Sequence, residues 1–313
     1  MDLCSVSRIR EMLAENGLSP RKSLGQNFLI NPRIPAMIAE RSADLARINV
    51  SGEARVGVIE IGPGIGALTA ELAEVFDRVI AVEIDTGLAE LFEKTFADFE
   101  NVKLIVGDVM KTDVPALLED HFGDILASGG SVSVCANLPY YITTPVIMKL
   151  LESFDPTGKC PFSSLTVMIQ SEVADRLTAR AGTPEYGSIT ASVSLRADVV
   201  KNFDVSPGSF YPPPKVTSTV ISIIPHGGIR ERFSDAPEDD IECRDFYDAT
   251  SKIIDASFAQ RRKTLTNALS GMYPKESVAS ALIRLGKNPD IRGERLSAED
   301  FCALAFQLNT RKE

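Results

Sequence analysis

Three residues suited to binding an adenosine stand where short apolar runs end. Glu83, Asp108 and Asn137 each close or follow a run typical of a buried strand. A carboxylate such as Glu83 can accept hydrogen bonds from ribose hydroxyls, and one such as Asp108 can accept from the exocyclic amine of adenine. Each acid taken alone is equally typical of a helix N-cap or an exposed turn. Their placement on successive strand ends favours a ligand site, with Asn137 nearest the reacting group.

Asn137 opens the tetrapeptide Asn-Leu-Pro-Tyr, which suits chemistry on the amino group of a base. Such an amine is a poor nucleophile because its lone pair is delocalised into the ring. The side-chain carbonyl of Asn137 and the backbone carbonyl of Leu138 or Pro139 could accept both amine hydrogens and aim the lone pair at a methyl donor. Pro139 fixes the backbone, and Tyr140 offers an aromatic face for stacking, with no strong base required. An ordinary proline turn after a strand is the alternative.

A glycine-rich turn precedes these residues in the chain. The run VGVIEIGPGIGALT, residues 56–69, ends its apolar part at Gly62, and Gly62, Gly64 and Gly66 leave the backbone bare before a predicted helix. A ligand can lie against such backbone at the positive end of a helix. The pattern G-x-G-x-x-G/A, with Glu83 about 20 residues later, fits a nicotinamide cofactor as well as S-adenosylmethionine. An ordinary tight turn is the remaining alternative.

Strands and helices alternate around these residues. Strands are predicted at 56–61, 79–84, 102–106, 131–136, 165–169, 199–205 and 216–224, and helices at 5–16, 34–46, 67–76, 87–96, 114–121, 145–154, 172–179 and 189–197. Alternation of this kind implies a mainly parallel sheet with helices on both faces and binding sites at the carboxyl ends of the strands. We therefore predict an α/β, Rossmann-like fold.

The chain beyond residue 228 has a different pattern. Residues 225–240 have the composition of a linker, with a charged run over 230–240, and no strand is predicted after it. Helices are predicted at 246–257, 262–269, 275–285 and 298–307. We expect a cofactor-binding catalytic domain over 1–228 and a small all-helical C-terminal domain over 229–313.

Composition limits the other possibilities. The 313 residues are 44% hydrophobic and contain neither a run of roughly 20 apolar residues nor a signal-peptide core, so we expect a cytoplasmic protein without a membrane partner. Five scattered cysteines and two histidines make a disulfide framework or a metal site unexpected. The formal charge is −10, but residues 1–33 and 241–313 each carry a small basic excess that could meet a polyanion. An acid-rich host proteome would also account for the charge.

Seven motifs in order resemble the family of ribosomal RNA adenine N6-dimethyltransferases. They are GQNFL (25–29), EIGPGIGALT (60–69), VEID (82–85), GD (107–108), NLPY (137–140), FYPPPKV (210–216) and FAQRRKTLTNAL (258–269). The resemblance covers about residues 20 to 300. It favours the housekeeping branch, which dimethylates two adjacent adenosines in the 3′-terminal hairpin loop of 16S rRNA, over the branch that methylates large-subunit RNA. It implies S-adenosylmethionine as cofactor, the small ribosomal subunit as partner, a role in subunit biogenesis, and a monomer.

The resemblance also implies roles at matching positions. Cofactor contacts are expected from Asn27, Leu29, Gly62, Gly64, Glu83, Ile84, Asp108, Val109 and Asn137. The catalytic residues would be Asn137, Pro139, Tyr140 and Phe210, the two aromatic rings holding the flipped adenine between them. RNA contacts are expected from Arg261, Arg262 and Lys263 in the C-terminal domain, although a solvated helix face would account for these three equally well.

Two other classes of function remain open from the residues alone. A nicotinamide-dependent oxidoreductase would use the glycine turn and Glu83 but would leave residues 137–140 and 261–263 without a role. A non-catalytic assembly factor that binds the small subunit could coexist with the enzyme.

Overall fold

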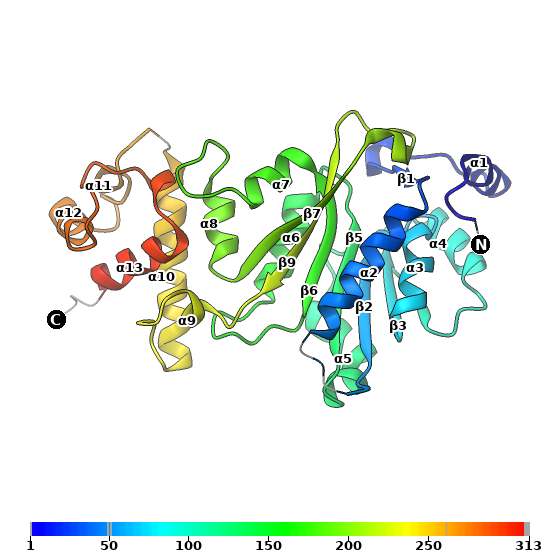
Figure 1. The fold of residues 1–313 in the computed structure, drawn as a ribbon, viewed down its shortest axis with the longest axis horizontal. Coiled ribbons are helices and arrows are strands. Elements are labelled where there is room, and N and C mark those ends of the chain that lie inside the picture. The colour runs from blue at the N-terminus through cyan, green and yellow to red at the C-terminus, as the bar shows by residue number, and fades with distance from the viewer. Residues whose placement is uncertain (1, 49, 51, 261, 310–313) are drawn as a thin grey trace. The chain divides into compact units, whose positions relative to one another are not determined.

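A computed structural model describes residues 2–48, 50, 52–260 and 262–309 (Figure 1). The chain divides into two compact units. The first comprises Met1–Ser153, Pro161–Ala174 and Val200–Ile224, and the second comprises Phe154–Cys160, Asp175–Val199 and Pro225–Glu313. The chain passes between the units several times, so this division is not a single cut in the sequence. The functional division into 1–228 and 229–313 stays a prediction.

A seven-stranded sheet organises the first unit, with strand order β4-β3-β2-β5-β6-β9-β7. Its strands are β2 (Val56–Ile61), β3 (Arg78–Glu83), β4 (Val102–Val106), β5 (Ser131–Asn137), β6 (Ser164–Gln170), β7 (Ala197–Val205) and β9 (Ser218–Pro225). Strands β2 to β6 are parallel to one another, and β9 runs antiparallel to β6. The predicted α/β fold with a mainly parallel sheet is confirmed.

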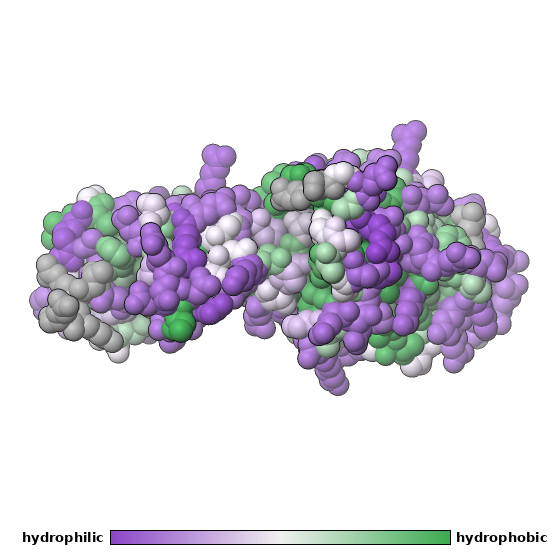
Figure 2. Space-filling model, turned by 90° about the horizontal axis from the view of Figure 1, so that it is seen from below, coloured by the Kyte–Doolittle hydropathy of each residue, from purple (hydrophilic) through white to green (hydrophobic). Residues whose placement is uncertain are grey.

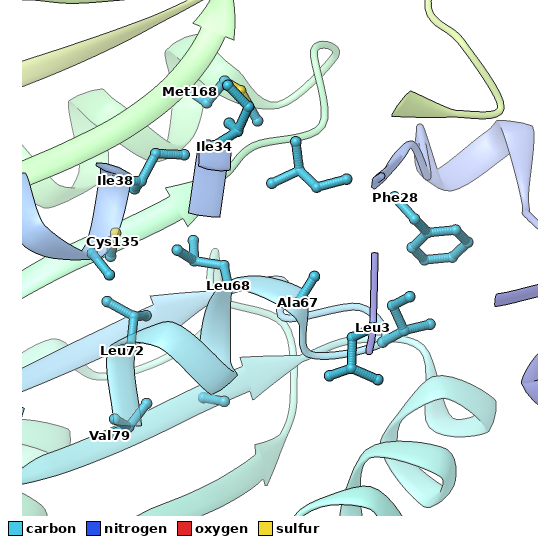
Figure 3. Packing of buried hydrophobic residues seen from close by; sticks show 14 of the residues in the cluster. Leu3, Phe28, Ile34, Ile38, Ala67, Leu68, Leu72, Val79, Cys135 and Met168 are labelled. Carbon is cyan, nitrogen blue, oxygen red and sulfur yellow. The ribbon is translucent and has the colours of Figure 1, made fainter. Parts of the chain in front are cut away.

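Helices cover both faces of this sheet. The helices that precede the C-terminal region are α1 (Val6–Glu15), α2 (Arg33–Arg47), α3 (Ala67–Val75), α4 (Thr86–Thr95), α5 (Val114–Ala127), α6 (Thr143–Glu152), α7 (Ser171–Leu177) and α8 (Ser188–Ser194). Val58 of β2 shares a buried cluster with Ile38 of α2 and Leu72 of α3 (Figure 3). The neighbouring Gly57 faces α5, where a Cβ would lie 2.4 Å from the Phe122 ring. Since adjacent strand residues point to opposite faces, α5 lies on the other side from α2 and α3.

A second sheet of two short strands was not predicted. Strands β1 (Phe28–Leu29) and β8 (Phe210–Tyr211) pair antiparallel, with Leu29 opposite Phe210. The amide of Ile30 continues the contact by donating to the carbonyl of Ser209 at 2.8 Å. Two segments that carry separate motifs are therefore joined, and Phe210 lies in one of the two paired strands.

Helices make up most of the second unit. Those after the sheet are α9 (Ile229–Arg232), α10 (Asp240–Ala259), α11 (Leu265–Ala268), α12 (Lys275–Arg284) and α13 (Ala298–Asn309), as the predicted helical C-terminal region requires. Residues of α10, α12 and α13 share a buried cluster that includes Ile253, Leu282 and Phe301.

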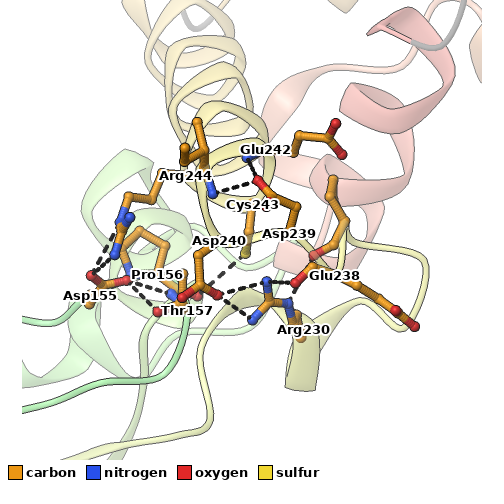
Figure 4. A network of polar contacts seen from close by, with 12 residues as sticks. Asp155, Pro156, Thr157, Arg230, Glu238, Asp239, Asp240, Glu242, Cys243 and Arg244 are labelled. Carbon is orange, nitrogen blue, oxygen red and sulfur yellow. Dashed lines mark hydrogen bonds and ion pairs between the residues drawn. The ribbon is translucent and has the colours of Figure 1, made fainter.

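The charged run 230–240 is folded and is not a plain linker. The Arg230 guanidinium donates to the carbonyl of Pro237 at 2.8 Å and pairs with Asp240 at 3.2 Å (Figure 4). Asp239 caps α10 by accepting from the amide of Ile241 at 2.9 Å. The segment predicted as a linker thus has a defined structure, because Arg230 binds carbonyls and the Asp240 carboxylate of its own loop, which composition alone does not reveal.

The described residues contain no helix long and apolar enough to cross a membrane. On the face drawn in Figure 2, hydrophobic residues form small separate groups among hydrophilic ones.

Candidate active site

A cavity of about 270 Å³ opens at the carboxyl ends of β2, β3, β4 and β5. The parallel register of these strands brings their last residues to one edge of the sheet. The volume of the cavity is just below the roughly 300–1,000 Å³ usual for ligand pockets. All the cofactor-binding and catalytic residues predicted from the sequence line it: Asn27, Leu29, Gly62, Gly64, Glu83, Ile84, Asp108, Val109, Asn137, Pro139, Tyr140 and Phe210. The roles of these residues stay predictions.

The glycine turn forms the part of the cavity that follows β2. Gly62 and Gly64 have φ of +68° and +59°, in the left-handed region that residues with a Cβ rarely adopt. The amide of Gly62 donates to the carbonyl of Val82 at 2.9 Å, and that of Gly64 donates to Glu83 Oε2 at 3.2 Å. The turn is therefore fixed to the end of β3, and α3 begins directly after it at Ala67.

Glu83 is buried, with an exposed fraction of 5%, and is held by backbone donors. Besides the Gly64 amide, the amide of Asp85 donates to its Oε1 at 2.8 Å. Burial raises the pKa of the Glu83 carboxyl above its ordinary value, against the opposite effect of these hydrogen bonds. Ile84 beside it is exposed and lines the cavity.

The turn after β4 carries Asp108 and Val109. Asp108 Oδ1 accepts from the amide of Met110 at 2.9 Å, which sets the turn. Lys149 of α6 donates to the Met110 carbonyl at 2.9 Å and ties the turn to the next helix. Among the described residues no donor contacts the other carboxylate oxygen of Asp108, and its contact with a ligand amine stays a prediction.

The amide of Asn137 has a defined orientation. Its Nδ2 donates to the carbonyl of Asn27 at 3.2 Å, and no donor from the described part of the chain contacts its Oδ1. The carbonyl of Pro139 is already occupied, because the Ile142 amide and the Thr143 hydroxyl donate to it at 3.1 and 3.2 Å. Of the two backbone acceptors expected from the sequence, Leu138 is thus the one that remains, since among the described residues no donor contacts its carbonyl.

Two aromatic side chains stand at the same cavity. The Tyr140 hydroxyl forms a 2.7 Å hydrogen bond with the Ser218 hydroxyl, and burial raises the pKa of this tyrosine, so the hydroxyl stays protonated. Phe210 is buried, at 3% exposure, by its place in β8.

Asp85 joins the segment before β1 to the end of β3, a role that the sequence did not indicate. Its Oδ2 accepts from Gln26 Nε2 at 2.9 Å, and its Oδ1 pairs with Arg21 at 3.1 Å. The carboxyl also caps α4 by accepting from the Gly87 amide at 3.1 Å. Asn27 and Leu29, two predicted cofactor contacts, follow Gln26 closely in the chain. The bonds from Asp85 to Arg21 and Gln26 therefore help to fix Asn27 and Leu29 in the wall of the cavity.

We expect Asp85→Ala to weaken cofactor binding about tenfold, since each hydrogen bond to a buried charged group contributes roughly 1.5–3 kcal/mol. The measurement is calorimetric titration with S-adenosylhomocysteine. Asp113→Ala is a matched control, because Asp113 caps α5 by accepting from the Ala116 amide at 3.1 Å, whereas Gln26, which donates to Asp85, lines the cavity. Equal losses in the two variants would mean that Asp85 acts only as a helix cap.

Glu60 is a second residue that the sequence analysis did not single out. It lies in β2 beneath the glycine turn, lines the cavity, and is 1% exposed. Thr69 of α3 donates to its Oε2 at 2.6 Å. Burial raises the pKa of the Glu60 carboxyl to about 8, an effect that the Thr69 hydrogen bond opposes. The folded protein therefore holds a proton that the unfolded chain releases at lower pH.

This proton makes stability depend on pH. The carboxyl has a pKa of 4.5 in the unfolded chain and about 8 in the folded protein. The contribution of Glu60 to the free energy of unfolding is therefore largest below pH 4.5 and decreases as the pH rises towards about 8. We expect Glu60→Gln to be increasingly stabilised relative to wild type across this window, with the difference measured as urea midpoints at several pH values. The exposed Glu74→Gln is the control. A constant difference between wild type and Glu60→Gln would contradict the assignment.

The basic cluster lies in the second unit. Arg262 and Lys263 are exposed in the turn between α10 and α11, and Arg261 lies outside the described residues. The helix predicted over 262–269 begins only at Leu265, because Thr264 is extended and the Lys263 amide closes a turn by donating to the Gln260 carbonyl. Contact of Arg261, Arg262 and Lys263 with RNA stays a prediction.

The cavity combines unoccupied acceptors at Asn137 and Leu138 with an open glycine turn, a set that suits a methyltransferase acting on a nucleobase. The sheet has the arrangement of S-adenosylmethionine-dependent methyltransferases. The chain belongs to the ribosomal RNA adenine dimethylase family, whose model matches residues 17–309. The predicted family, enzyme class and cofactor are thereby confirmed.

Individual proteins agree with this membership. The chain is 40% identical to the ribosomal RNA small subunit methyltransferase A of Anoxybacillus flavithermus, over 98% of this chain and 96% of that one. It is 39% identical to the protein of the same description from Shouchella clausii, with the same coverage. A dimethyladenosine transferase structure from Plasmodium falciparum has a TM-score of 0.63 at 25% identity, covering 86% of this chain and 94% of that one. The structure of the 23S rRNA methyltransferase ErmE shares the fold, with a TM-score of 0.66 at 21% identity, covering 90% and 100%.

Proposed function

We propose that this chain dimethylates N6 of two adjacent adenosines in the 3′-terminal hairpin loop of 16S rRNA, with S-adenosylmethionine as methyl donor. Family membership and relatives described as small subunit methyltransferases over nearly their whole length support this substrate. The observation that carries the chemistry is the orientation of Asn137. Because its nitrogen is engaged by Asn27, its oxygen is the atom left to accept from a substrate amine.

The residues of the cavity fit S-adenosylmethionine. The space over the glycine turn is open, since a Cβ at Gly62 would meet no atom within 4 Å. When bound, the cofactor supplies an electrophilic methyl group. Glu83 would accept from the ribose hydroxyls and Asp108 from the adenine amine, as their chemistry suits. The remaining contacts are proposed for Asn27, Leu29, Gly62, Gly64, Ile84 and Val109.

The chain's own residues would prepare the target amine. Asn137 Oδ1 and the Leu138 carbonyl accept its two hydrogens and direct the nitrogen lone pair into the cavity. Pro139 acts through its backbone, whose carbonyl is held by the first turn of α6. Tyr140 and Phe210 supply the rings between which the flipped base stacks. The proton becomes acidic once nitrogen is alkylated, so it can leave to water without a histidine.

An RNA substrate also requires contacts to its phosphates, which we propose for the basic cluster of the second unit. Arg261, Arg262 and Lys263 would contact phosphates of the small subunit, where cationic side chains add affinity without reading sequence. We also propose a monomeric, cytoplasmic enzyme that acts in subunit biogenesis. Among the described residues all five cysteines are free thiols, which agrees with a reducing compartment.

Purified protein, radioactive methyl donor and small subunits lacking the modification test this proposal. We expect label in N6,N6-dimethyladenosine of 16S rRNA. Label confined to large-subunit RNA in a parallel reaction would overturn the proposed substrate, and an absence of label in both would overturn the activity.

A further inference from the structure

Tyr141 is an exposed aromatic residue beside the cavity that the chemistry above does not use. It follows Tyr140 directly, lines the cavity, and is 57% exposed. The two tyrosines differ in their hydroxyls: that of Tyr140 is bound to Ser218, whereas no hydrogen bond from the described residues reaches that of Tyr141. Tyr141 thus presents most of its side chain to solvent at the cavity's edge.

The backbone around Tyr141 holds it in place. The Ile142 amide donates to the Pro139 carbonyl at 3.1 Å, which forms a turn with Tyr141 inside it just before α6 begins. The ring lies near Gly25: a Cβ added at Gly25 would lie 3.6 Å from Tyr141 Cδ1 and 3.1 Å from Pro139 Cβ. Gly25 has φ of +63°, so the residue that supports the ring is itself suited to glycine. The backbone of Tyr141 is therefore fixed by the turn, and its ring lies at the edge of the cavity beside Gly25.

A substrate of adjacent adenosines creates a need for such a surface. An enzyme that takes one base out of its stack leaves the neighbouring base without a stacking partner on one side, which costs free energy. An aromatic ring can replace that partner, and because every base has a π-face the contact tolerates sequence. Tyr141 lines the same cavity as Asn137 and Tyr140, so its exposed ring stands beside the place proposed for the target base.

We propose that Tyr141 contacts the substrate by stacking on the nucleobase adjacent to the adenosine held in the cavity. This inference rests on the proposed function. It makes Tyr141 a determinant of substrate binding, separate from the groups that hold the cofactor and the reacting amine.

The test compares Tyr141→Leu and Tyr141→Phe with wild type. Leucine keeps an apolar side chain against Gly25 but removes the ring, whereas phenylalanine keeps the ring and removes only the hydroxyl. Leu126→Ala is the control, because Leu126 is an exposed apolar residue of α5 that does not line the cavity. The readouts are kcat/KM on unmodified small subunits, affinity for S-adenosylhomocysteine, and thermal midpoint.

We expect Tyr141→Leu to lower kcat/KM about tenfold, with cofactor affinity and thermal midpoint unchanged, and Tyr141→Phe and Leu126→Ala to stay within about twofold of wild type. Wild-type kcat/KM in Tyr141→Leu would overturn the inference, as would a parallel loss of cofactor affinity, which would make the ring a support for residues 21–29 only. If wild type itself fails to methylate the subunits, the proposed function fails, and the inference falls with it.

Discussion

Replacing Asn137 by alanine is expected to lower kcat for methylation of small subunits by about 10²–10³-fold, the loss typical when one group that stabilises the transition state is removed. Asn137 Oδ1 is the side-chain acceptor proposed for the target amine, and the adjacent Pro139 carbonyl cannot replace it, because it already accepts two hydrogen bonds. Without Asn137, one amine hydrogen faces an apolar methyl group. The lone pair then stays delocalised in the ring.

Cofactor binding should change much less in this variant. The Asn137 side chain contributes one neutral hydrogen bond to the Asn27 carbonyl, and such a bond is worth roughly 0.5–1.5 kcal/mol. We expect affinity for S-adenosylhomocysteine, measured by calorimetry, to fall by less than about tenfold. Asn202→Ala is the control, since Asn202 is a half-buried amide in β7 that donates to Ser222. An Asn137→Ala enzyme that retains wild-type kcat would exclude Asn137 as the acceptor.

Replacing Glu83 by alanine is expected to weaken S-adenosylhomocysteine binding by about 100-fold, because hydrogen bonds to charged groups contribute roughly 1.5–3 kcal/mol each. Two effects combine in this variant. The ribose hydroxyls lose their proposed acceptor, and the amides of Gly64 and Asp85, which donate to Glu83 at 3.2 and 2.8 Å, are left without theirs. The glycine turn thus loses one of its two hydrogen bonds to β3 and keeps the one from the Gly62 amide to the Val82 carbonyl.

The measurement is again calorimetric titration, with two comparison variants. Glu90→Ala removes an exposed carboxylate from α4 and should bind the cofactor as wild type does. Glu83→Gln keeps one acceptor oxygen and should lie between alanine and wild type. If Glu83→Ala binds as tightly as Glu90→Ala, the ribose is held elsewhere and the cofactor orientation proposed above is wrong.

Much of the site was predictable because its residues belong to local patterns. Strand ends in a parallel sheet converge, so Glu83, Asp108 and Asn137 could be expected together from the alternation of strands and helices alone. Their common cavity agrees with that expectation. The bare backbone at Gly62 and Gly64 followed from residue type, because only glycine readily adopts their positive φ.

Contacts between distant segments could not be predicted. Strands β1 and β8 have two residues each, too few for a hydrophobic period, and their pairing joins Leu29 to Phe210. Asp85 belongs to a motif, but its hydrogen bond comes from Gln26, 59 positions earlier in the chain. Glu60 is buried because α3, with Thr69, packs over β2. The sequence of the strand alone does not show which helix covers it. In each case tertiary packing supplies the partner.

Mass mapping of 16S rRNA from cells that lack this protein tests the central claim most directly. We expect two adjacent adenosines near the 3′ end to carry no N6-methyl groups, and a wild-type copy of the chain, but not an Asn137→Ala copy, to restore both. Full dimethylation of these adenosines in cells lacking the protein would contradict the account, as would a loss of methylation confined to large-subunit RNA.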